Sequence, residues 1–389
     1  MRLITHIKAS NLLSFGPDGL DLELHDLNVL IGPNGSGKSN FLEIFEILKA
    51  LPRGDEDSNN LEQVISRGGG IEEWIMKIGK NSSFQIQAET TIEHFLLDEK
   101  SSVDHTLTCS KFQLIQEEKI SPIGAGNKNP VSVSRLARGQ IMFGPSSGTL
   151  ENGTSFVSRG FSPLSTRASN RLLNDLASSY ERIRLYREWS FGRNTIFRTP
   201  QRADLRNDRL EADFSNLGMF LSRLRKDPTT KRALITALQD LYEGLTDFEV
   251  VTEGGGVQIF FTEGDFSIPA TRLSDGTLRY LCLLAILLDP TPPPLICIEE
   301  PELGLHPDIL PKIADLLVDA STRTQLIVTT HSDVLIDALS EQPESVLVCE
   351  KHEGQTQIKR LDRADIGHWL KDYRLGQLWT RGEIGGTRW

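Results

Sequence analysis

Long apolar runs and targeting segments are scarce in this chain of 389 residues. The longest uninterrupted apolar run, Leu281 to Leu288, is far shorter than the ~20 residues that a membrane-spanning helix needs. The opening residues, MRLITHIKASNLLSF, lack the long apolar core of a secretory signal. Both absences favour a cytoplasmic protein that has no membrane partner.

Cysteine is also rare, and its few copies are far apart with no C-x-x-C pair: Cys109, Cys282, Cys297 and Cys349. Cys282 and Cys297 lie in apolar runs, which is typical of reduced core residues in a reducing compartment. The sequence has no His/Cys metal cluster and no H-E-x-x-H motif. These absences argue against a disulfide scaffold and against a zinc hydrolase.

The chain has no net positive charge overall, but positive charge is concentrated locally. The net charge of −11 argues against a generally basic nucleic-acid-binding protein. Between Arg159 and Arg232, however, 16 Lys and Arg face 8 Asp and Glu, which gives this segment a charge of +8. Such a segment can contact a phosphate backbone, and a solvated helical face would show the same composition.

The residues that are present point first to a phosphate-binding loop in Leu27 to Asn40, LNVLIGPNGSGKSN. An apolar strand leads into a loop that fits G-x-x-x-x-G-K-[ST], and helical apolar spacing follows. Glycines let backbone N–H groups close around phosphate oxygens, Lys38 brings a charge to the β and γ phosphates, and the Ser39 hydroxyl suits Mg²⁺. We predict ATP binding by seven loop residues: Asn34, Gly35, Ser36, Gly37, Lys38, Ser39 and Asn40.

Two further motifs follow buried strands. Apolar Leu295 to Ile298 delivers Glu299 and Glu300 to a strand end, and Thr329-Thr330-His331 follows a second apolar run about thirty residues later. We expect Glu299 to support Mg²⁺, Glu300 to polarise the attacking water, and His331 to sense the γ phosphate. The alternatives are solvated or helix-capping carboxylates and a structural turn histidine.

A fourth motif, LSDGT, opens a long apolar helix at Leu273 to Thr277. Ser274 can simply cap this helix. Alternatively, Ser274, the Gly276 backbone and the helix N-terminus can bind phosphate held by another subunit.

The overall pattern predicts an α/β fold with a mainly parallel sheet, flanking helices and an attached antiparallel β subdomain. An N-terminal hairpin, strands at 73–79, 83–92 and 105–115, and loops with weak strands over 120–160 make up the N-terminal part. We predict three domains: an N-terminal ATPase lobe at 1–160, a helical basic insertion at 161–247, and a C-terminal ATPase lobe at 248–389.

In order along the chain, the phosphate loop, LSDGT, ICIEEPE and TTHS resemble the Walker A, signature, Walker B and switch-histidine motifs of ABC-type ATPases. The soluble SMC-like, RecF-like and OLD-type branch is the closer resemblance. EEPELGLHP and the ending LGQLWTRGEIGGTRW further resemble a family of bacterial AAA-type ATPases in genome-defence loci. The resemblance covers about residues 1–60 and 270–389.

The resemblance implies an ABC-type ATPase head in which ATP is sandwiched in a homodimer or higher oligomer, with Ser274 and Gly276 completing the site of a second subunit. Asp275, Thr277 and Glu299 depart from the usual motif residues, which implies slow hydrolysis, and no glutamine is assigned to the Q-loop.

About fifty residues follow Ser340, too few for the Toprim nuclease domain of OLD-type proteins. Three acidic residues there are better explained as helix-surface carboxylates: Asp362, Asp365 and Asp372. The resemblance therefore implies a separate nuclease or effector partner in antiviral defence, with nucleic acid, more readily DNA, as a further partner. The alternatives are a RecF-like DNA-repair ATPase, an ATP-dependent scaffold and a transporter subunit.

Overall fold

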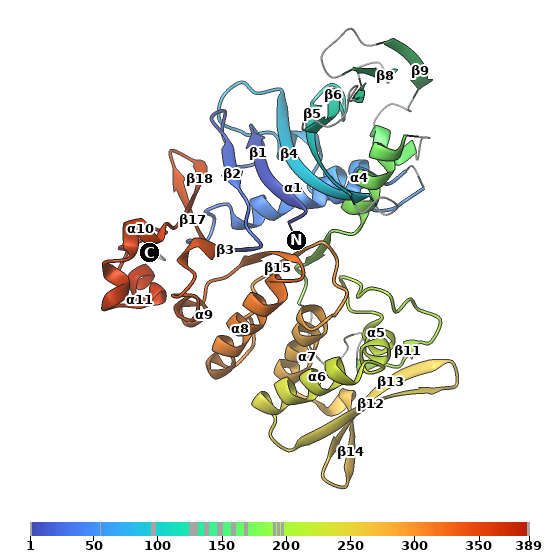
Figure 1. Cartoon of the computed structure of the whole chain (residues 1–389), viewed down its shortest axis with the longest axis vertical. Helices are drawn as coiled ribbons and strands as arrows, with labels where there is room; N and C mark the ends of the chain where they lie inside the picture. The colour runs from blue at the N-terminus through green and yellow to red at the C-terminus, as the bar shows by residue number, and fades with distance from the viewer. Residues whose placement is uncertain are drawn as a thin grey trace. The chain divides into compact units, whose positions relative to one another are not determined.

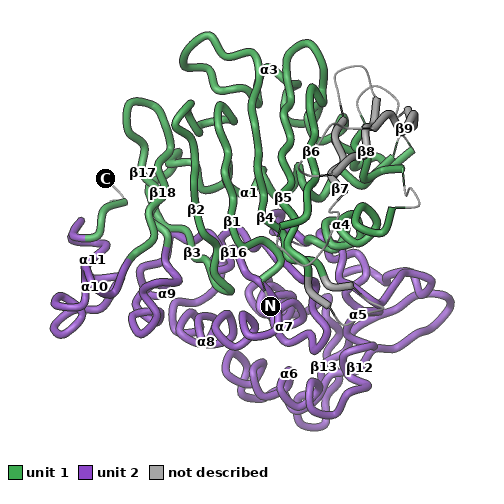
Figure 2. Tube along the Cα trace, turned by 45° about the horizontal axis from the view of Figure 1, so that its top comes forward, with its two compact units in different colours: residues 1–183, 347–361, 384–389 green, residues 184–346, 362–383 purple. Residues whose placement is uncertain are grey.

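The computed structural model describes residues 2–54, 56–94, 99–123, 131–135, 140–145, 151–156, 161–166, 170–189, 192, 195 and 198–386. The chain forms two compact units (Figure 2). Unit 1 comprises residues 1–183, 347–361 and 384–389, and unit 2 comprises residues 184–346 and 362–383. The units thus divide the chain at other positions than the predicted domains. Each unit is described by itself.

Unit 1 contains an eight-stranded antiparallel sheet of order β2-β1-β4-β5-β6-β7-β8-β9. Its strands are β1 (Ile4–Ser10), β2 (Leu20–Glu23), β4 (Ser83–His94), β5 (Glu99–Ser110), β6 (Glu117–Ile123), β7 (Val131–Arg135), β8 (Gln140–Pro145) and β9 (Glu151–Phe156). The predicted N-terminal hairpin is confirmed as β1 and β2. The weak strands predicted within 120–160 are β8 and β9, while the loops predicted at 124–130, 136–139, 146–150 and 157–160 lie outside the described residues.

The core of unit 1 follows the expected periodicities. Alternate residues of β4 are buried, which is the pattern of a strand with one covered face. Two helices also have one buried apolar face: α1 (Lys38–Ala50) and α4 (Arg171–Glu181). Phe41, Ile44 and Phe45 of α1 are fully buried, as their spacing predicts. Helix α4 packs on β4, and α1 packs on α4 (Figure 1).

The prediction of a strand at 73–79 is wrong. After helix α2 (Leu61–Arg67), the structure has a second short helix, α3 (Ile71–Trp74), which overlaps the start of this range, and only an isolated bridge follows at Ile75. The Trp74 side chain is buried, and its Nε1 donates to the carbonyl of Ile65 at 3.1 Å. This contact with the preceding helix favours a helical turn over the extended backbone that local propensity predicts.

Unit 2 contains three parallel strands, of which β15 lies between the other two. The strands are β10 (Arg184–Tyr186), β15 (Leu295–Glu299) and β16 (Gln325–Thr329), and the helices of this part are α7 (Asp275–Leu287), α8 (Leu310–Ser321) and α9 (Asp333–Ala338). This alternation of strands and helices confirms the predicted α/β arrangement. Buried apolar residues form the run Leu295 to Ile298 in β15 and the run Leu326 to Val328 in β16, as parallel strands with two covered faces require.

Strand β10 corrects one sequence prediction. Helical periodicity predicts a helix from Arg167 to about Tyr186, but α4 ends at Glu181 and a strand follows, while 167–169 lie outside the described residues. Residues Arg184 to Tyr186 pair in parallel with Ile296 to Ile298. This pairing is a contact over more than a hundred residues, so local periodicity does not reveal it.

The rest of unit 2 forms a second, antiparallel sheet and two helices that pack on it (Figure 1). The elements are β11 (Gln201–Arg202), β12 (Leu245–Glu253), β13 (Gly256–Glu263), β14 (Phe266–Pro269), α5 (Leu217–Leu224) and α6 (Pro228–Leu241). The three strands predicted from Phe248 onwards are confirmed. The helices predicted at 216–225 and 231–241 are confirmed as α5 and α6.

The C-terminal elements are short. The predicted C-terminal hairpin is confirmed as β17 (Val346–His352) and β18 (Gln355–Arg360). Residues 347–361 of this hairpin belong to unit 1, where β17 lies beside β3 (Leu27–Ile31). Two short helices, α10 (Arg363–Ile366) and α11 (Leu375–Thr380), belong to unit 2. All four cysteines are buried and free, which confirms the prediction made for Cys282 and Cys297. Within the described part of the chain, no helix is long and apolar enough to cross a membrane.

Candidate functional site

The phosphate loop lies between β3 and α1 in unit 1, and its backbone requires glycine at two crowded positions. Gly32 has φ 148° and Gly37 has φ 104°. A Cβ on Gly32 would lie 2.2 Å from the carbonyl oxygen of Cys349, and one on Gly37 would lie 2.2 Å from Thr356 Oγ1. Any side chain would therefore push the loop away from the strand pair β17–β18.

Three side chains of the loop have defined environments. Lys38, 6% exposed, donates from Nζ to the carbonyl oxygens of Gly32 at 2.8 Å and Pro33 at 3.1 Å. Ser36 Oγ is buried and has no hydrogen-bond partner among the described residues. The Asn40 amide donates to Ser14 Oγ at 2.7 Å, so its side chain also supports the segment after β1.

The loop fits a triphosphate by its own chemistry. A Cβ on Gly35 would meet nothing within 4 Å, so the outer side of the loop is open. The buried, unpartnered hydroxyl of Ser36 and the ammonium of Lys38 are both able to donate hydrogen bonds to phosphate oxygens. Ser39 is an exposed residue in the first turn of α1.

Thr356 on β18 supports the loop from behind. Its Oγ1 lies 2.8 Å from the carbonyl oxygen of Ser36 and 2.6 Å from Ser14 Oγ. Thr356 is 320 residues from Ser36 in sequence. The motif does not include this residue, and no signal near the loop could have revealed it.

In unit 2, the predicted catalytic carboxylates lie at the C-terminal end of β15. Glu299 Oε2 accepts a hydrogen bond from Arg187 Nε at 2.8 Å, and the Glu299 carbonyl accepts one from Trp189 Nε1 at 2.6 Å. Glu300 adopts a left-handed backbone conformation with φ 48°, fixed by its N–H bond to the carbonyl of Thr329 at 3.0 Å. Strained backbone of this kind often marks functional sites.

His331 joins this group from the end of β16. Its Nε2 lies 3.4 Å from Glu300 Oε1. The strand register explains why the two side chains approach each other. Glu299 of β15 pairs with Thr329 of β16, so both strands end at the same edge of the sheet. The structure thus brings Glu299, Glu300 and His331 together.

Glu302 holds the histidine segment in place. Its Oε1 accepts hydrogen bonds from Thr330 Oγ1 at 2.8 Å and from the His331 N–H at 2.6 Å. Burial raises the pKa of this carboxyl group above its ordinary value, against the opposing effect of these hydrogen bonds. Glu302 was not among the predicted site residues, although the third carboxylate in E-E-P-E is a visible signal.

The LSDGT segment opens α7 in unit 2. Ser274 Oγ accepts a hydrogen bond from the Thr277 N–H at 3.0 Å, which confirms its role as a helix cap. A Cβ on Gly276 would lie 3.3 Å from the carbonyl oxygen of Gly304, so α7 begins close to the turn after the carboxylates. Arg198 pairs with Asp275.

A sequence model of the family described as "AAA domain, putative AbiEii toxin, Type IV TA system" matches residues 27–337. The match begins at the first residue of β3, ends in α9 and includes every predicted site residue. The chain belongs to this AAA-domain family. No curated protein matches it.

Solved structures identify the fold of this AAA-domain protein. One is an SMC head bound to the C-terminal winged-helix domain of ScpA, with 15% identity, a TM-score of 0.56, and coverage of 93% of this chain and 99% of that chain. Another is an SMC head with an extended coiled coil, bound to the C-terminal domain of ScpA, from Pyrococcus furiosus, with 14% identity, a TM-score of 0.55, and coverage of 96% and 99%. The predicted ABC-type ATPase head fold is confirmed.

The predicted site of the AAA-domain protein divides between its two units. The phosphate loop, with Lys38 and Ser39, belongs to unit 1, whereas Glu299, Glu300 and His331 belong to unit 2. Within the described ranges, no group of three or more His, Cys, Asp and Glu side chains is arranged to hold a metal ion.

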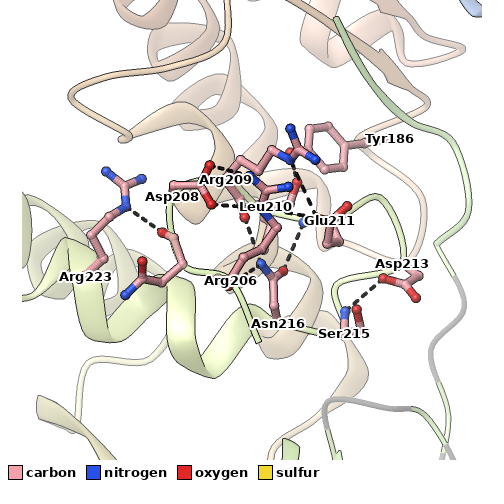
Figure 3. Close-up of polar contacts among 11 residues, drawn as sticks. Tyr186, Arg206, Asp208, Arg209, Leu210, Glu211, Asp213, Ser215, Asn216 and Arg223 are labelled. Carbon is pink, nitrogen blue, oxygen red and sulfur yellow. Dashed lines mark hydrogen bonds and ion pairs between the residues drawn. The ribbon is translucent and has the colours of Figure 1, made fainter. Parts of the chain in front are cut away.

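The basic segment uses several of its arginines internally (Figure 3). Arg206 pairs with Asp208, and Arg223 pairs with Asp289. Asn216, fully buried, donates to the carbonyl oxygens of Arg206 at 2.9 Å and Arg209 at 2.7 Å, which fixes the loop between them. Some of its arginines are therefore already paired with carboxylates, Asp208 inside the segment and Asp289 outside it.

Proposed function

We propose that this AAA-domain protein binds ATP with Mg²⁺ and hydrolyses it, and that two copies close around the nucleotide. The observation that carries the proposal is the Glu300–His331 pair at the ends of two neighbouring parallel strands, in a chain with a complete phosphate loop. The Lys38 ammonium would neutralise charge on the β and γ phosphates. Ser39 and Glu299 supply the oxygen ligands that Mg²⁺ prefers, and the ion would offset the charge of the same phosphates.

Glu300 is the proposed catalytic base. Its carboxylate accepts a proton from water as the water oxygen bonds to the γ phosphorus and the bond to the β-phosphate oxygen breaks. His331, 3.4 Å from Glu300 Oε1, orients that carboxylate and senses the γ phosphate. The Glu302 carboxylate keeps the His331 backbone in place. The products are ADP and inorganic phosphate.

The second copy would supply the signature residues. Ser274 is exposed at the N-terminus of the 13-residue helix α7, where partial positive charge favours a phosphate. Gly276 follows in the first turn of the same helix. We infer from this placement and from the family resemblance that Ser274 and Gly276 complete the site of the opposite copy.

Phosphate release tests the hydrolysis step. Purified wild-type protein should release phosphate from ATP, and Glu300→Gln should reduce the rate by at least roughly a hundredfold, the usual scale for loss of a general base. Lys38→Ala should also reduce the rate, because it removes the charge beside the β and γ phosphates. Lys371→Ala, a change of an exposed lysine, serves as the control. A wild-type protein that binds ATP but releases no phosphate would contradict the proposed ATPase activity and support the alternative of an ATP-dependent scaffold.

We further propose that the ATP-bound state is read by a separate nuclease or effector in antiviral defence. The resemblance to AAA-type ATPases of genome-defence loci supports this proposal. Glu300→Gln with ATP should retain such a partner from the native host, and Lys38→Ala should not. Retention of a membrane transporter by the same bait would instead support the transporter alternative.

Nucleic acid is the second proposed partner, through the basic segment. Changing Arg202, Arg206 and Arg209 to Glu should lower DNA affinity and flatten its dependence on salt, because fewer phosphate contacts release fewer counterions. Each of these arginines already lies near an acid two residues later, so phosphate has to compete with those carboxylates. Changing Asp204, Asp208 and Glu211 to neutral amides should therefore raise the affinity. Unchanged binding in both variants would assign the segment to another partner.

A further inference from the structure

The segment that follows β10 makes contacts that the proposed chemistry does not use. Strand β10 pairs in parallel with β15, with Tyr186 opposite Ile298. Arg187, the residue after the end of β10, therefore lies at the same edge of the sheet as Glu299, the last residue of β15. This register places a cation beside the carboxylate that is proposed to support Mg²⁺.

Glu299 is held at two points by this segment. Arg187 Nε lies 2.8 Å from Glu299 Oε2, and Trp189 Nε1 donates to the Glu299 carbonyl oxygen at 2.6 Å. The side chains of Arg187 and Glu299 are 27% and 18% exposed, so solvent screens this ion pair only in part. One contact fixes the carboxylate and the other fixes the backbone.

The segment itself is anchored by contacts of Trp189 with two other residues. The indole ring stacks on Phe214 with 5.5 Å between the ring centroids. Arg279 of α7 donates from Nη2 to the Trp189 carbonyl oxygen at 3.0 Å, and its guanidinium lies 5.6 Å from the indole centroid. Arg187 therefore projects from a fixed support rather than from a free loop.

We propose that Arg187 is a positioning residue that keeps Glu299 from binding a divalent cation until a nucleotide is present. This inference rests on the proposed role of Glu299. A carboxylate paired with a guanidinium attracts a second cation weakly, because the +2 and +1 charges repel each other at short range. A bound triphosphate adds negative charge and oxygen ligands, which offset this repulsion. Arg187 thus makes metal loading dependent on the nucleotide.

Direct binding of Mn²⁺, followed by the electron paramagnetic resonance signal of the free ion, tests the proposal without turnover. In the absence of nucleotide, Arg187→Gln should bind Mn²⁺ roughly fivefold more tightly than wild type, the change that ~1 kcal/mol gives. Arg187→Lys, which keeps the charge, should stay close to wild type. Arg202→Gln removes an exposed arginine of another ion pair and serves as the matched control.

The gain should require the carboxylate, so Arg187→Gln combined with Glu299→Gln should lose it. Should Arg187→Gln fold poorly, as judged by its thermal midpoint, Arg187→Met removes the same charge and should give the same gain. Equal or weaker Mn²⁺ binding by both neutral variants would overturn the proposal. A wild-type protein that binds no ATP would instead overturn the proposed function, because the Mn²⁺ comparison is made without nucleotide.

Discussion

At the scale of single residues, Glu302 links stability to pH. Burial raises the pKa of its carboxyl group above the ordinary 4.5. A raised pKa in the folded state stabilises the fold fully below the unfolded value, and this stabilisation is lost as the pH rises through the folded value. Glu302→Gln mimics the protonated group and removes this dependence. The thermal midpoint of wild type minus that of Glu302→Gln should therefore fall as the pH rises from about 4.5.

Glu253→Gln, on the exposed part of β12, is the matched control for Glu302→Gln. Glu253→Gln also removes one carboxyl group, so it corrects for the loss of one charge. An offset between wild type and Glu302→Gln that stays constant with pH would show that Glu302 is protonated to the same extent in the folded and unfolded states.

At the scale of elements, β18 and the phosphate loop act as one structural group through Thr356. Thr356→Val keeps the shape of the side chain and removes the hydroxyl near the Ser36 carbonyl and Ser14 Oγ. Loss of such contacts costs ~1 kcal/mol each. We expect a lower thermal midpoint and weaker ATP binding, measured with a fluorescent ATP analogue. Thr252→Val, at an exposed position of β12, should change neither, and an unchanged Thr356→Val would remove β18 from the loop's support.

The same scale shows which parts of the structure the sequence could predict. The β3–loop–α1 segment and the strands β15 and β16 were predictable from the sequence. A phosphate loop is a contiguous motif, and a buried parallel strand is a contiguous apolar run. The strand predicted at 73–79 failed because Trp74 packs on α2, and β10 was missed because its partner lies far along the chain.

Most of the supporting contacts of the candidate site were not predictable for the same reason. Arg187 is 112 residues from Glu299. Thr356 is 320 residues from Ser36. No motif spacing encodes pairs at such separations, and only the register of the sheets brings them together. Glu302 was within reach of the sequence, since it stands beside the predicted carboxylates.

At the scale of the whole molecule, we propose that a second copy completes the site. The chain has the ABC-type head fold, LSDGT lies at an exposed helix N-terminus, and the resemblance to ABC-type ATPases implies that this motif acts on the opposite copy. If the signature residues act on the opposite copy, nucleotide binding and dimerisation are one event. A variant that binds ATP without hydrolysing it should then accumulate as a dimer.

The most direct test is the mass of Glu300→Gln with and without ATP, measured by light scattering after gel filtration. We expect a monomer of 43.4 kDa without ATP and a dimer with ATP and Mg²⁺. Adding Lys38→Ala should abolish the dimer by removing ATP binding, and adding Ser274→Arg should abolish it while ATP still binds. A Glu300→Gln protein that binds ATP and stays monomeric would contradict the shared-site account.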